Sequence, residues 1–170
     1  MTLVEHRTAG WMNGGTARTL LAAALTANLA VPPIAAAAPI EAGKGVDVAI
    51  AAFKDVCLRS APSFAGASAK AKRYGIKELT AFGDSAMGMT DDNSLSVQIK
   101  PNRECAVTSP NRSNPALHAQ FLRAISEFAD KAPQNNKAGT PFPSMVKGHR
   151  FVFQHDRNGG EAYVMLSLEK

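Results

Sequence analysis

The chain has 170 residues, with 19 lysines and arginines against 14 aspartates and glutamates, and a formal net charge of +5. Its basic residues are spread along the sequence, so no nucleic-acid partner is expected. A mild positive charge of this kind serves solubility, and it can also attract the protein to anionic surfaces. Removing the leader described next leaves about 133 residues, enough to bury a core, which excludes a mini-protein held together by disulfides alone.

The N-terminal segment is typical of a secretory signal peptide. Arg7 and Arg18 precede an apolar run at residues 20–31, and a tract of small residues follows at 35–38. This is the charged, apolar and small-residue layout of an export signal. We therefore expect residues 1–37 to be cleaved off, and the protein to be periplasmic or secreted.

The start and end of this leader have alternatives. Met12 is a second possible start, which gives a shorter leader with one arginine and no acid. Cleavage after Ala36 or Ala37 is favoured, because cleavage after Ala38 would leave Pro39 as the first residue. The apolar run covers 12 residues, whereas a spanning helix needs about 20. No membrane span is therefore expected after processing.

The mature part is predicted to have a flexible lead-in, residues 38–45, and a single domain, residues 46–170. Two helices open this domain. The first ends before Pro62 and is predicted by apolar residues at helical spacing: Val46, Ile50, Phe53 and Cys57. The second is predicted from an N-cap at Ser63 to a stop at Gly75, with an apolar stripe of Phe64, Ala67, Ala71 and Tyr74.

Basic residues cluster on and just after the second helix: Lys70, Lys72, Arg73 and Lys77. Such a helix face can bind phosphate or anionic lipid, although most faces of this kind are simply solvated. The four residues are the candidate contacts for an anionic ligand.

Period-two patterns predict a sheet of about four to five strands. Two strands form a hairpin around Pro101 and Asn102, and two more flank the turn at Asn158. These strands lie at 95–99, 105–107, 151–153 and 163–167, with a weaker extended stretch at 79–90. Hairpin links make the sheet antiparallel.

A third helix is predicted between the two hairpins. Asn114 is its expected N-cap, Pro115 its first residue and Pro133 its end. Residues 134–143 are too polar and too rich in proline and glycine to be regular, so they are expected to form a loop. The order is then α-α-β-β-β-α-β-β, an α+β fold of two layers with the helices on one face.

Cys57 and Cys105 are the two cysteines of the chain. In an oxidising compartment two cysteines usually pair. Their spacing matches no C-x-x-C redox motif and no zinc pattern. The sequence therefore predicts a disulfide between the first helix and the sheet.

The segment Gly83-Asp84-Ser85 resembles the opening motif of the GDSL esterases, in which the serine is the nucleophile. Those enzymes also need a D-x-x-H pair downstream to supply the base, and none follows Ser85. Glycine, aspartate and serine are also common turn residues. A turn is therefore the favoured interpretation, and no catalytic residue is assigned.

Three histidines lie in the mature part. On an extended strand His149 and His155 would be roughly 20 Å apart, too far for one metal, and His118 belongs to a helix. We therefore expect histidines that are exposed or packed singly. No metal site and no cofactor is predicted, because phosphate-binding and haem-binding motifs are also absent from the sequence.

The pattern Phe53-x-x-x-Cys57, a strand pair and Cys105-x-Val107, followed by a helix rich in alanine and leucine, resembles small uncharacterised exported proteins of Gram-negative bacteria. The resemblance spans most of the mature chain and implies no activity.

The leading functional hypothesis is an exported binding or interaction domain that is not an enzyme, with an envelope protein or an anionic surface as partner. The alternatives are a small envelope hydrolase whose site is not recognised from the sequence, with only the weak motif at Gly83–Ser85 to indicate it, and an inhibitor or accessory of a cell-wall enzyme.

Overall fold

The computed structural model describes residues 45–110, 114–134, 137–158 and 160–169. All of them belong to one unit of the chain, Ala36–Lys170. The predicted leader, 1–37, and all but the last residue of the predicted lead-in, 38–45, lie outside the described residues.

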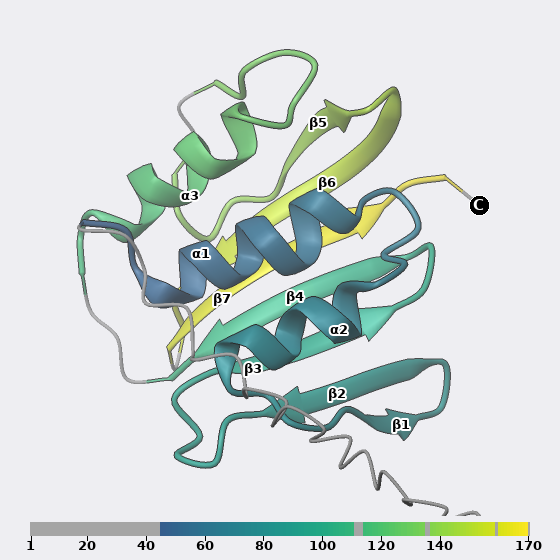
Figure 1. Ribbon diagram of the computed structural model, residues 1–170. Helices are drawn as coiled ribbons and strands as arrows, with labels where there is room; N and C mark the ends of the chain where they lie inside the picture. The colour runs from purple at the N-terminus through teal and green to yellow at the C-terminus, as the bar shows by residue number, and fades with distance from the viewer. Residues whose placement is uncertain (1–44, 111–113, 135–136, 159, 170) are drawn as a thin grey trace, which may run out of the picture. The chain divides into compact units, whose positions relative to one another are not determined.

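Seven strands form one antiparallel sheet in the order β1-β2-β3-β4-β7-β6-β5 (Figure 1). The antiparallel α+β class is confirmed, whereas the expectation of four to five strands is wrong. The strands are β1 (Thr80–Phe82), β2 (Ser85–Met89), β3 (Ser96–Lys100), β4 (Glu104–Ser109), β5 (Phe142–Val146), β6 (His149–Asp156) and β7 (Glu161–Ser167).

The additional strands come from two segments with misleading turn residues. The stretch 79–90 is two paired strands, because Gly83 takes a positive φ of 61° and closes a tight turn between them. The expected loop 134–143 ends in the edge strand β5, which contains Pro143. An edge strand tolerates proline because one side of its backbone needs no ladder hydrogen bonds.

The apolar residues of neighbouring strands align in rows on one face of the sheet. Because side chains alternate between the two faces, each row belongs wholly to the core side. One row consists of Val97, Val107, Tyr163 and His155, and the next of Ile99, Cys105, Met165, Phe153 and Phe142. All of these side chains are buried, so His155 occupies a core position.

The helices pack on this same face, as the two-layer expectation requires (Figure 1). The helix α1 (Val48–Ala52) is capped by the Asp47 side chain, which accepts a hydrogen bond from Ala49 N. It continues as a wider π turn (Phe53–Cys57) and a tighter turn (Leu58–Ser60). The predicted stripe from Ile50 to Cys57 is buried, whereas Val46 precedes the helix and is exposed.

The second helix, α2 (Ala67–Ala71), begins later than expected and is extended by a tight turn (Lys72–Tyr74). Its N-cap is Gly66, and the predicted cap Ser63 instead accepts a hydrogen bond from Ala65 N in the preceding turn. Gly75 ends the segment with a φ of 84°, as expected for a helix stop.

The third helix, α3 (Leu117–Ser126), is shorter than predicted at both ends. The Asn114 side chain accepts from Ala116 N, which makes a turn before the helix rather than its cap. Beyond Ser126 the chain leaves the helix to bridge to the sheet, because Ala129 pairs with Val146 of β5. These tertiary hydrogen bonds replace the last predicted turn.

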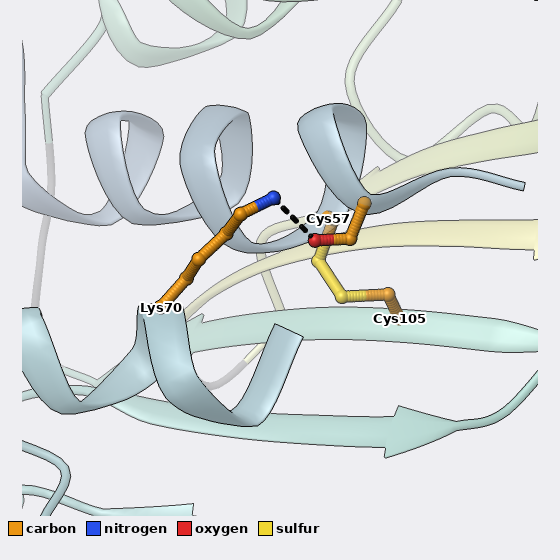
Figure 2. Close-up of a disulfide and its surroundings, with 4 residues drawn as sticks. Cys57, Lys70 and Cys105 are labelled. Carbon is orange, nitrogen blue, oxygen red and sulfur yellow. Dashed lines mark hydrogen bonds between the residues drawn. A yellow bond between two sulfur atoms is a disulfide. The ribbon is translucent and has the colours of Figure 1, made fainter. Parts of the chain in front are cut away.

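A disulfide joins Cys57 of the α1 segment to Cys105 of β4, with 5.4 Å between their Cα atoms (Figure 2). The predicted pairing is therefore confirmed. The bond links the helical layer to the centre of the sheet.

Candidate functional site

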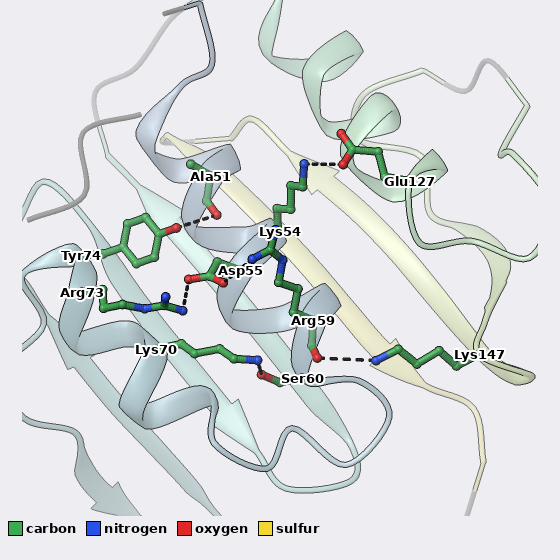
Figure 3. A network of polar contacts seen from close by, with 10 residues as sticks. All are labelled: Ala51, Lys54, Asp55, Arg59, Ser60, Lys70, Arg73, Tyr74, Glu127 and Lys147. Carbon is green, nitrogen blue, oxygen red and sulfur yellow. Dashed lines mark hydrogen bonds and ion pairs between the residues drawn. The ribbon is translucent and has the colours of Figure 1, made fainter. Parts of the chain in front are cut away.

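Asp55 is a nearly buried carboxylate in the π turn that continues α1. Its side chain is 9% exposed, and two guanidinium groups contact it from the helical layer (Figure 3). Arg73 Nη2 lies 2.5 Å from Oδ2, and Arg59 Nη1 lies 3.4 Å from Oδ1. A buried carboxylate is costly unless it is paired, so these two arginines are what allows Asp55 to lie here.

Two lysines from different elements bind the end of the α1 segment, a few residues after Asp55. Lys70 Nζ donates to Ser60 Oγ at 2.8 Å (Figure 3). Lys147 Nζ donates to the carbonyl of Ala61 at 2.9 Å and also lies 3.5 Å from the carbonyl of Arg59, the contact drawn in Figure 3. Partial burial holds the pKa of Lys70 below its usual value. The positive charges of Arg73, Lys147 and Arg59 add to this shift, and Asp55 opposes it.

Positive charge therefore exceeds negative charge around Asp55. We call Arg59, Lys70, Arg73 and Lys147 the cation cluster. These side chains carry four positive charges, and Asp55 neutralises one of them. Arg59 and Arg73 remain 54% and 41% exposed. The N–H groups that Asp55 does not occupy can meet an anion from solvent.

A shallow hollow of about 300 Å³ opens beside Asp55. The Asp55 hollow is lined by Val46, Ala51, Lys54, Asp55, Arg59, Arg73 and Tyr74. Tyr74 donates its hydroxyl to the Ala51 carbonyl at 3.1 Å, and burial raises the pKa of Tyr74 to about 12, helped by the nearby Asp55 charge. Tyr74 is thus neutral at ordinary pH and adds an apolar ring to a cationic rim.

The structure brings only part of the predicted anion contacts together. Lys70 and Arg73 belong to the cation cluster, whereas Lys72 is exposed two residues from Lys70, a spacing that does not share a helix face. Lys77 lies beyond the helix stop and pairs with Asp91 at 2.5 Å. The four residues therefore do not form one group, and their role as contacts for an anionic ligand stays a prediction.

Sequence reasoning missed Arg59 and Lys147. The spacing of Asp55 and Arg59, four residues apart on a helix, could have indicated their pairing. No local signal exists for Lys147, which follows Ala61 by 86 residues and is brought to it by the sheet.

The histidines also depart from expectation, because His118 and His155 form a pair. Their rings stack with centroids 5.3 Å apart, and their Nδ1 atoms lie 3.1 Å apart. His155 Nε2 is hydrogen-bonded to the buried carboxylate of Glu161, which also accepts from Arg157 at 2.9 Å. The prediction of single histidines fails because α3 places His118 over the inward-facing His155.

This cluster has two imidazole rings and one carboxylate, whose second oxygen accepts from Arg157. Within the part of the chain that the structure describes, no group of three or more histidine, cysteine, aspartate or glutamate side chains is arranged so that it could hold a metal ion.

Ser85 is the first residue of β2, directly after the turn that joins β1 to β2, and its Oγ donates to the Phe82 carbonyl at 2.8 Å. Three strands separate β2 from β6, which carries His155 and His149. At a strand spacing of about 4.8 Å, these histidines are roughly 19 Å from Ser85. His118 stacks on His155 and is as distant. None of the histidines in the described ranges can therefore act as a base for Ser85.

Exposed apolar side chains lie on β1 and β2, the strands at one edge of the sheet. Phe82 is 78% exposed, and Met87 and Met89 are also exposed. They line a second hollow, of about 620 Å³, whose rim includes the Lys77–Asp91 pair.

No helix within the described segments is long and apolar enough to cross a membrane. Comparisons with known proteins found no family model, no curated protein and no solved structure that matches this chain.

Proposed function

We propose that this chain is an exported binding domain that takes an anionic group in the Asp55 hollow. The observation that carries the proposal is the surplus of positive charge there. Two arginines of the cation cluster contact the single carboxylate of Asp55, and its two lysines are hydrogen-bonded to Ser60 and Ala61 in the segment that follows. The arginines, Arg59 and Arg73, keep a large exposed fraction beside a concave surface.

The chemistry of the hollow favours a phosphate or carboxylate group joined to a small apolar body. Guanidinium groups match the planar or tetrahedral oxygens of these anions, and charge-assisted hydrogen bonds are stronger than neutral ones. The Ala51 and Tyr74 side chains offer apolar contact below the cationic rim. The volume of about 300 Å³ lies at the lower end of small-molecule sites.

The test titrates the full chain with inorganic phosphate and, separately, with vesicles of phosphatidylglycerol or phosphatidylcholine. Backbone amide shifts in NMR report where each probe binds. Phosphate should shift amides around Asp55. An additional preference for phosphatidylglycerol vesicles would identify a lipid headgroup as the source of the anion, and equal response to both lipids would favour a soluble ligand.

Arg59→Gln is the informative variant and Lys72→Gln is its matched control. Both remove one positive charge from the helical layer, but only Arg59 lines the hollow. We expect Arg59→Gln to weaken phosphate binding by about tenfold, and Lys72→Gln to change it less than twofold. Equal weakening by both variants would mean attraction by net charge alone and would overturn the proposal.

A further inference from the structure

The first turn of α3 is fastened to the sheet through His118 and His155. Apolar rings enclose His155, with the Tyr163 and Phe121 centroids 4.6 Å and 5.6 Å from its own. His155 and Glu161 are buried. The charged and titratable groups that face His155 are His118 from α3, Glu161 and Tyr163 from β7, and Arg157 from the turn between the strands.

The hydrogen bonds fix where the protons of the neutral pair lie. His155 Nε2–H donates to the Glu161 carboxylate, so its Nδ1 carries a lone pair and accepts. His118 must then supply the hydrogen for the 3.1 Å contact between the two Nδ1 atoms. One added proton keeps this bond, because a charged ring still donates to a neutral one.

A second added proton removes the bond. Both Nδ1 atoms would then carry a hydrogen, although the 3.1 Å between them has room for only one. Two adjacent imidazolium rings and Arg157 would face the single carboxylate of Glu161 in a buried place. One of these charges would also lie in the first turn of α3, where the helix dipole disfavours a cation.

We propose that the His118–His155 pair is an acid-sensitive latch, which holds the start of α3 on the sheet until both rings are charged and then releases it. This inference does not rest on the anion site, because it concerns a different cluster of side chains.

The direction of the pH effect follows from the burial of His155. Burial lowers the pKa of His155 below 6.5, and the charges of His118 and Arg157 add to the shift, while Glu161 opposes it. The open state, in which His155 meets water, therefore binds more protons than the closed state. The closed state is fully stable above about pH 6.5 and loses stability as the pH falls below that value.

Release of α3 would also affect residues on either side of α1, because side chains of α3 and of the residue after it bind them. Gln120 of α3 accepts from Asp47 N at 2.9 Å and donates to the Gly45 carbonyl at 3.1 Å. Glu127, directly after α3, forms an ion pair with Lys54. Opening the latch should therefore loosen residues 45–47 together with α3.

The test measures hydrogen-exchange protection of the α3 amides in the full chain between pH 5 and 8, corrected for intrinsic exchange. Wild-type protection should fall by up to tenfold per pH unit below about 6.5. In His118→Asn the side-chain amide cannot become charged and can turn to accept from a protonated His155. The fall should therefore shrink to the part that comes from the burial of His155. His149→Gln removes an exposed histidine from the same strand and should keep the wild-type fall.

A flat wild-type profile, or an equal fall in His118→Asn, would overturn the latch. If His118→Asn does not fold, ¹⁵N NMR of the wild-type imidazoles decides the matter. Loss of α3 protection should coincide with protonation of all four ring nitrogens of the pair. Full protonation of both rings with α3 still protected would refute the proposal.

Discussion

Asp55 and Glu161 are both carboxylates withdrawn from water, and their surroundings differ in one decisive way. Asp55 is paired with two arginines that remain about half exposed, at the edge of a hollow. Glu161 is paired with Arg157 and with a histidine enclosed by aromatic rings. At Asp55 the arginine side chains can still meet a ligand from solvent. At Glu161 the partners are enclosed, and the property that can change there is the protonation of the histidines. The same need for a buried partner thus underlies both proposals, a binding site at Asp55 and a pH-sensitive contact at Glu161.

The largest expected effect is the loss of stability on removing the disulfide, which should affect the region of Asp55 more than α3. Cys57 lies two residues after Asp55 and is bonded to Cys105, 48 residues later in the chain. Replacing both by alanine should lower the free energy of unfolding by about 4 kcal/mol, because the unfolded chain gains loop freedom. Urea unfolding measures the loss. In the folded variant, amide hydrogen exchange should accelerate more near Asp55 than in α3. An equal increase in both regions would contradict the expectation that the disulfide mainly supports the region of Asp55.

An intermediate effect comes from neutralising each carboxylate in turn. Glu161→Gln should cost about 3 kcal/mol, because Arg157 and His155 lose a buried partner. Asp55→Asn should cost less, about 2 kcal/mol, since its arginines can turn to solvent. Asp55→Asn should also tighten phosphate binding, whereas Glu161→Gln should leave it unchanged. Urea unfolding and phosphate titration of both variants measure these effects, and identical phosphate affinities would break the comparison.

The smallest effect concerns Tyr74 at the side of the hollow. Tyr74→Phe loses the hydrogen bond to the Ala51 carbonyl and should cost about 1 kcal/mol. The raised pKa of Tyr74, about 12, also means that the folded state holds its phenolic proton more tightly than the unfolded state does. Wild-type stability from this group is present below about pH 10 and is lost as the pH rises towards 12. Unfolding curves of Tyr74→Phe should lack this alkaline component.

The sequence was a good guide wherever local chemistry decided the structure. The apolar alternation of β3, β4, β6 and β7 predicted the centre of the sheet. The expectation of an oxidising compartment predicted the Cys57–Cys105 disulfide, which the structure contains. Gly75 ends its helix as its conformational freedom suggests. Pro143 misled the prediction, since its effect depends on whether a strand lies at an edge, and an edge is a property of the whole sheet.

The sites were harder to predict because they are assembled by topology. Lys147 reaches the end of the α1 segment only after the β5–β6 hairpin has formed, and His118 meets His155 only after α3 has packed on β6. Sequence spacing alone treated these residues as separate. By contrast, Lys70 and Arg73 share a helical segment, which is why both were identified from the sequence as possible anion contacts.

The place of β7 has a consequence for how the domain is made. This strand is the last of the seven in chain order, yet it lies between β4 and β6 and joins the two halves of the sheet. The strands β1 to β4 and the pair β5–β6 can each pair among themselves, but they become one sheet only when residues 161–167 lie between them. Closing the sheet therefore depends on contacts distant in sequence, such as that between β4 and β7, and such contacts slow folding.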